Sequence, residues 1–184
     1  MESKEKNTKE KILEEALKLF AQSGYMGTSM NDIASKLGVT KAALYKHYKS
    51  KQEILDSIIE KMNELDIERV KLYEMPEGDL EKVTAEYKET AFDKIKQFTK
   101  VQFLHWTEEE FSSCFRKMLT LEQYREPQMA QLYQNYLASG PLTYMEALFS
   151  GMLGDEGKAR QTALDFYGPI FLLYSIYDGA EDKS

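Results

Sequence analysis

Cysteine and histidine are scarce in this sequence, which has one cysteine, Cys114, and two histidines among its 184 residues. A single cysteine cannot close an intramolecular disulfide, and this set cannot build a cysteine-rich or histidine-rich metal site. Only four prolines and ten glycines are present, which argues against a disordered or linker-rich chain. We therefore expect an ordered protein that holds no metal and no cofactor. The single cysteine fits a reducing compartment, so we expect the protein in the cytoplasm.

Long apolar runs are missing as well. Residues 1–11 are largely charged, which is not the pattern of a signal peptide. The most apolar stretch, residues 163–179, contains Asp165 and a Gly-Pro step and falls short of the ~20 apolar residues that a membrane helix needs. We expect no membrane partner.

Catalytic motifs are absent too. The sequence has no Gly-x-Ser-x-Gly, no His-Glu-x-x-His and no phosphate-binding loop, because Gly157-Lys158 is followed by alanine and lacks the earlier glycine. His105 and Cys114 stand nine residues apart, and a buried cysteine with an unrelated histidine is the simpler interpretation of that pair. We do not expect an enzyme.

Helical periodicity is what the sequence contains instead. Apolar residues recur at spacings of three and four along most of the chain, and no useful length of strand alternation is present. We predict an all-α protein with a DNA-binding domain at residues 1–52 and a helical domain at residues 53–184. The boundary falls at a connector helix that Lys51 opens.

Residues 28–51 predict two short helices around a tight turn. Gly38 permits the turn, while Ser29 and Thr40 are placed to cap the two helices, with Asp32 completing a capping box. This is the pattern of a helix-turn-helix, an element that binds DNA. Its apolar positions are Ile33, Ala34, Leu37, Val39 and Leu44.

Charge is distributed unevenly along the chain. The net charge is -7, which by itself disfavours a polyanionic partner. Residues 28–51 nevertheless carry five lysines against one acid, Asp32, so this segment is basic within an acidic chain. We interpret it as a surface for DNA, the alternative being an ordinary solvated helix face.

The segments GYMGTSMNDIA and LGVTKAALYKHYKSKQEIL, with the amphipathic helix before them, resemble the TetR (tetracycline-repressor type) family of bacterial transcription regulators. The resemblance covers about the first third of the chain, and the remainder is similar only in being helical and of suitable length. It implies a regulator, most simply a repressor, that binds a palindromic double-stranded DNA operator as a homodimer and is released by a small effector. The alternative is a DNA-binding or DNA-organising helical protein that responds to no ligand.

The resemblance also implies which residues contact DNA. Lys41 is placed to donate to guanine, and the Ala42 methyl to meet a thymine methyl. For Tyr45 the alternative is core packing, and for His47 it is a solvated or capping role. The implied base-reading residues are Lys41, Ala42, Lys46 and His47, and the implied phosphate-binding residues are Thr28, Ser29, Met30, Thr40, Tyr45 and Lys51.

In the remaining residues, the resemblance implies an effector cavity in the middle helices and dimerisation through the last two long helices, near residues 129–149 and 159–174. Aromatic and acidic residues together suggest a hydrophobic, cationic effector. Glu108, Glu109 and Glu110 are weaker candidates for its counter-charge, because acids are common in the first turn of a helix. The candidate pocket residues, with ordinary core packing as the alternative, are Phe103, Trp106, Phe111, Phe115, Tyr133 and Tyr136.

Overall fold

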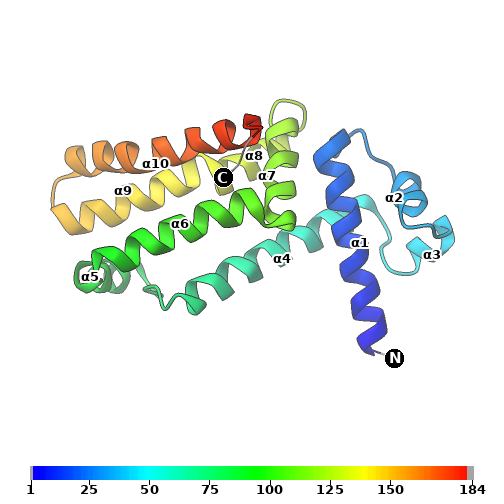
Figure 1. Ribbon diagram of the computed structural model, residues 1–184, viewed down its shortest axis with the longest axis horizontal. Coiled ribbons are helices and arrows are strands. Elements are labelled where there is room, and N and C mark those ends of the chain that lie inside the picture. Colours follow the sequence, from blue (N-terminus) through cyan, green and yellow to red (C-terminus); the bar gives the residue numbers. More distant parts are fainter. Residues whose placement is uncertain (1, 182–184) are drawn as a thin grey trace. The chain divides into compact units, whose positions relative to one another are not determined.

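The computed structural model describes residues 2–181, and the side chains from Asn7 onward. Within that part the chain is all-α and has no strand, as the sequence predicts (Figure 1). The helices are α1 (Glu2–Ser23), α2 (Met30–Lys36), α3 (Lys41–Tyr45), α4 (Lys51–Leu72), α5 (Leu80–Glu89), α6 (Phe92–Glu108), α7 (Glu110–Glu122), α8 (Pro127–Leu137), α9 (Ser139–Leu153) and α10 (Glu156–Gly179).

The helices group into two compact units. We call the first the head unit; it comprises the chain up to Ile67 together with Glu110–Ala130. The second, the body unit, comprises Glu68–Glu109 and Gln131–Ser184. Helix α4 therefore continues from one unit into the other, while α7 is grouped with the N-terminal helices although it lies far from them in the sequence.

The core of the head unit is built around α1. This helix packs on α7 and on α2, and α2 packs on α3. Because helices as short as α2 and α3 are unstable alone, the apolar stripe of α1 is what supports them. Each large apolar side chain that is fully buried here contributes about 1.5–3 kcal/mol. The fully buried side chains of this core include Leu17, Phe20, Ile33, Leu44, Ile54, Leu55, Ile58, Met62, Phe115, Met118, Leu119 and Met129.

The sequence predicts a first helix from about Thr8 after a capping box at Asn7 and Glu10, a helix capped by Thr107 with Glu110, and one opened by Pro127. The first two of these predicted helix starts are wrong. The first helix begins at Glu2 rather than at Thr8, since the preceding Glu and Lys residues are good helix formers and a capping box at Asn7 is not needed. Thr107 does not cap a helix either: it lies inside α6, where its hydroxyl donates to the Phe103 carbonyl at 2.8 Å. Pro127, in contrast, opens α8 as predicted.

In the body unit, α10 packs on α9 and α6, and α5 packs on α9. The two Gly-Pro steps act differently. Helix α9 starts at Ser139 and holds Pro141 in its first turn, where no intrahelical donor is lost, whereas Pro169 lies inside α10 and does not end it. Of the helices described, none is both long enough and apolar enough to cross a bilayer.

Candidate nucleic-acid interface

Local hydrogen bonds fix the helix-turn-helix. The Ser29 hydroxyl accepts the Asp32 amide at 3.2 Å, and the Asp32 carboxylate accepts the Ser29 amide at 2.8 Å and the Ser29 hydroxyl at 2.6 Å, so the predicted capping box is present. These bonds from Ser29 lower the pKa of Asp32. Gly38 has a φ of 66° at the turn, and the Thr40 hydroxyl accepts the Ala43 amide at 3.2 Å. Both short helices therefore start from satisfied caps.

The outer side of α3 carries a group of exposed side chains that we call the recognition face: Lys41, Ala42, Tyr45 and Lys46. Only Leu44 of α3 is buried, and it points into the head core. The Lys41 ammonium lies 5.8 Å from the centre of the Tyr45 ring. The structure thus brings three of the four base-reading candidates together on one exposed surface, with Tyr45 beside them.

His47 differs from those neighbours. It follows α3, is half-buried, and its Nδ1 has no hydrogen-bond partner among the described residues. Tyr48, the next residue, is buried and has the Lys9 ammonium 5.8 Å from its ring centre. Lys9 was not among the sequence candidates, because its spacing marks it only as an exposed position of α1.

Thr28 and Met30, two of the expected phosphate-binding residues, have buried side chains. The Thr28 hydroxyl donates to the Gly24 carbonyl at 2.8 Å, and the Thr28 amide donates to the Tyr25 carbonyl at 3.3 Å. Both donors of this threonine are therefore used within the turn. Met30 packs in the head core, while Ser29 and Thr40 are exposed.

Lys51 is also engaged inside the protein. Its ammonium donates to the Thr28 carbonyl at 2.7 Å and to the Tyr25 carbonyl, and it lies 4.2 Å from the centre of the Tyr25 ring. Burial lowers the pKa of Lys51, and the charge of Glu122 opposes that shift. The side chain joins the start of α4 to the turn after α1, so the ammonium of this expected phosphate clamp faces the protein in this structure.

The six pocket candidates do not lie in one unit. Phe111 and Phe115 belong to the head unit, where Phe115 is fully buried in the core and Phe111 has the Lys61 ammonium 4.6 Å from its ring centre. In the body unit, Phe103 stacks on Tyr174 with ring centres 5.6 Å apart. Trp106 and Tyr136 meet edge to face at 6.4 Å, and Tyr133 is half-buried. Helix α6 ends at Glu108, Glu109 is extended, and α7 starts at Glu110. This interruption separates the two groups of aromatic residues along the chain.

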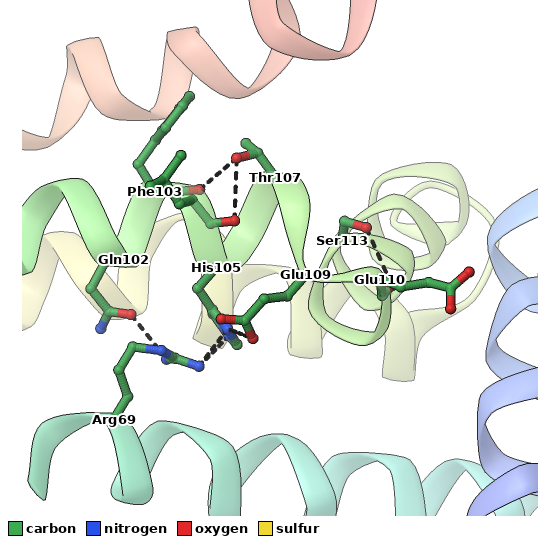
Figure 2. Close-up of polar contacts among 9 residues, drawn as sticks. Arg69, Gln102, Phe103, His105, Thr107, Glu109, Glu110 and Ser113 are labelled. Carbon is green, nitrogen blue, oxygen red and sulfur yellow. Dashed lines mark hydrogen bonds and ion pairs between the residues drawn. The ribbon is translucent and has the colours of Figure 1, made fainter. Parts of the chain in front are cut away.

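A polar cluster in the body unit was not predicted from the sequence (Figure 2). Arg69 of α4 is buried and donates to the Gln102 amide oxygen at 3.0 Å and to Nε2 of His105 at 2.8 Å. Nδ1 of His105, which is fully buried, lies 2.6 Å from the Glu109 carboxylate. Arg69 on α4 and His105 on α6 are 36 positions apart, so no local pattern could have identified their contact.

The body unit also has an open groove of about 920 Å³ between α5 and α9. None of the six aromatic candidates lines it. Thr84 and Gly151 both line the groove and lie close together, since a Cβ atom at position 151 would lie 2.8 Å from the Thr84 methyl carbon. Its lining residues are Leu80, Glu81, Thr84, Ala85, Lys88, Glu89, Ala147, Ser150 and Gly151.

Comparison with known proteins shows what the same segment is similar to. Residues 12–58 match the sequence profile described as bacterial regulatory proteins, tetR family. Over 52 residues the chain is 42% identical to the biofilm operon icaADBC HTH-type negative transcriptional regulator IcaR of Staphylococcus epidermidis, a match covering 28% of each protein. Over 51 residues it is 41% identical to IcaR of Staphylococcus aureus, covering 28% of this chain and 27% of that protein. The chain therefore matches under a third of the length of these relatives.

Solved structures agree with the fold over nearly the whole chain. A transcriptional regulator from Aquifex aeolicus VF5 is similar with a TM-score of 0.60 and 24% identity, over 95% of this chain and 90% of that one. A proposed fatty acid metabolism regulator from Clostridium perfringens has a TM-score of 0.59 and 23% identity, over 94% and 89% of the two chains. At such identities the likeness concerns the fold alone.

Replacing Lys51 by methionine is expected to lower the free energy of unfolding by about 1.5–3 kcal/mol, because two hydrogen bonds from a charged donor are lost. Lys49→Met, at an exposed position two residues earlier, should stay within about 0.5 kcal/mol of the wild type. Urea unfolding followed by circular dichroism measures both. A Lys51→Met protein as stable as the wild type, but weaker on every DNA sequence, would restore the phosphate-clamp assignment.

Proposed function

We propose that this chain is a member of the TetR family of bacterial regulatory proteins, whose profile its residues 12–58 match, and that it is a transcriptional repressor that binds a palindromic operator as a homodimer. A small hydrophobic effector that binds the body unit would release it. The profile describes bacterial regulatory proteins, so we expect no enzymatic activity. The direction of control is proposed from the IcaR relatives, which are negative regulators.

The observation that carries the proposal is the recognition face on α3. Its side chains are exposed, they include two lysines, and they stand on a helix whose cap and turn are fixed by hydrogen bonds. A helix of this kind fits the major groove, where Lys41 would donate to guanine N7 and O6 and Ala42 would meet a thymine methyl. Lys46 and His47 would lie near the same bases.

Phosphate contacts are proposed for fewer residues than the sequence alone implied. Ser29, Thr40 and Tyr45 are exposed around the two helix starts and remain candidates. The buried side chains of Thr28 and Met30, and the inward-facing ammonium of Lys51, support the head unit instead. We keep residues 1–52 as the proposed DNA-binding domain and residues 53–184 as the proposed effector and dimerisation domain.

Dimerisation is proposed through α9 and α10. These two helices pack on each other, and both also leave large apolar side chains in water. Such a row on packed helices is what a four-helix bundle between two copies would bury. Two-fold symmetry would then set the operator half-sites one helical turn, or a multiple of it, apart. The exposed apolar residues are Tyr144, Leu153, Leu164, Phe171, Leu172, Leu173 and Ile176.

Effector binding is proposed for the body unit. Aromatic pairs there, such as Phe103 with Tyr174 and Trp106 with Tyr136, would suit a hydrophobic molecule, and the acidity of the chain suggests a cationic one. If the effector releases DNA, then by linkage the operator weakens effector binding by the same factor. A protein that binds DNA but responds to no ligand is the alternative.

Selection from random duplex DNA should yield a palindrome that wild-type protein binds more tightly than a scrambled duplex. Lys41→Ala should lose about 1–3 kcal/mol of discrimination at one base pair of each half-site, because a base-edge donor is removed. Lys36→Ala, at an exposed lysine of α2, is the matched control and should keep that discrimination. Titrations of both duplexes over a salt series measure this. Equal losses on both duplexes for Lys41→Ala would remove it from the base-reading set.

Leu172→Glu and Ile176→Glu should weaken the dimer by at least about tenfold, because they put charges into an apolar interface. The two side chains are 60% and 56% exposed in the single chain, so the fold should tolerate both changes. Leu72→Glu on α4, where leucine is 76% exposed, is the control. Sedimentation velocity over a concentration series measures the dimer. A wild type that is monomeric at all concentrations would contradict this interface.

A thermal-shift screen of cationic, neutral and anionic hydrophobic compounds should give stabilisation by cations, since a ligand at 100 times its Kd adds about 2.7 kcal/mol to the native state. The same compounds should reduce binding to the selected duplex. Stabilisation by anions alone would contradict the proposed charge of the effector. If no compound class changes either the melting temperature or DNA binding, the ligand-independent alternative is favoured.

A further inference from the structure

Glu122, the last residue of α7, lies in an unusual place for a carboxylate. Its side chain is fully buried in the head unit, and neither carboxylate oxygen has a hydrogen-bond partner among the residues that the structure describes. Its nearest charged neighbour in sequence is Arg125, with NH1 3.6 Å from Oε1, and that arginine side chain is mostly exposed. A buried carboxylate without hydrogen bonds is costly, so its position calls for an explanation.

The Glu122 carboxylate lies against Gly24, which ends α1 with a φ of 80°. A methyl group built at Gly24 would lie 1.9 Å from Oε1 of Glu122, so the carboxylate occupies the space that any side chain at position 24 would need. The backbone conformation therefore favours glycine at this position, and a side chain there would also displace the carboxylate from α7.

Lys51 holds the same turn from α4. Its ammonium donates to the carbonyls of Tyr25 and Thr28, and the charge of Glu122 acts on it. Residues 24–28 are therefore hydrogen-bonded to a base of α4 and lie, at Gly24, against an acid of α7. The turn leads directly into Ser29, the cap of α2, so its position determines where the helix-turn-helix begins.

We propose that Glu122 is a positioning residue through which α7 holds the turn at residues 24–28, and with it the helix-turn-helix, in the arrangement that binds DNA. A shift of α7 would withdraw the carboxylate from Gly24 and Lys51 and release the turn. The effect on DNA rests on the proposed function, whereas the effect on the turn does not.

The test compares Glu122→Gln, which keeps the size and removes the charge, with Glu110→Gln at the other end of α7. Glu110 is an exposed partner of Lys18 at 3.1 Å and serves as the matched control. Amide hydrogen exchange of residues 24–28, the melting temperature, and affinity for the selected and scrambled duplexes are measured on the full chain. Lys51→Met and the double variant complete a cycle.

Glu122→Gln should speed exchange at residues 24–28 and weaken binding to the selected duplex by about five- to tenfold, with little change on the scrambled duplex. Glu110→Gln should match the wild type. The double variant should lose no more affinity than the worse single variant, because the two charges act on each other. Glu122→Asp, which keeps the charge but draws it away from Gly24, should show the same faster exchange.

The proposal is overturned if Glu122→Gln leaves the turn and duplex affinity unchanged. It is equally overturned if exchange rises uniformly over the head unit with a fall in melting temperature, since that is a general loss of stability. A wild type that selects no duplex would contradict the proposed function, and the exchange of residues 24–28 would still decide the role of Glu122.

Discussion

The head unit depends on the burial of α1 between the short DNA-binding helices and α7. Helices of seven and five residues bury too little surface to fold alone, so α2 and α3 exist because Ile33 and Leu44 enter a core that α1, α4 and α7 supply. Phe115, Met118 and Leu119 of α7 are as fully buried as the apolar residues of α1. The proposed surface for DNA is therefore stabilised in part by residues more than 60 positions further along the chain.

Local features of the head could be predicted from the sequence because local chemistry decides them. Ser29 with Asp32, Thr40, Gly38 and the start of α4 at Lys51 all lie where spacing and capping place them. The exposed side of α3 follows from the same periodicity, since Leu44 alone is buried. The family resemblance rests on these residues.

The features that could not be predicted from the sequence depend on contacts between residues far apart in the chain. The partner of Lys51 is the turn at residues 25–28, more than 20 positions earlier, and nothing in the spacing distinguishes a lysine that binds carbonyls from one that binds phosphate. Arg69 and His105 meet across two helices. The sequence predicts Phe111 and Phe115 as pocket residues because they are aromatic and recur at the spacing of an amphipathic helix. They belong to the head unit, which the chain re-enters after the helix interruption at Glu109.

The placement of α7 in the head unit has a consequence for how this protein can be made and divided. The head unit contains residues up to Ala130, so its core can be completed only after most of the chain has been synthesised. For the same reason, a fragment ending at Ile67 would leave the α7-facing side of α1 exposed to water. Exchanging DNA-binding heads between relatives would therefore require carrying α7 along with the N-terminal residues.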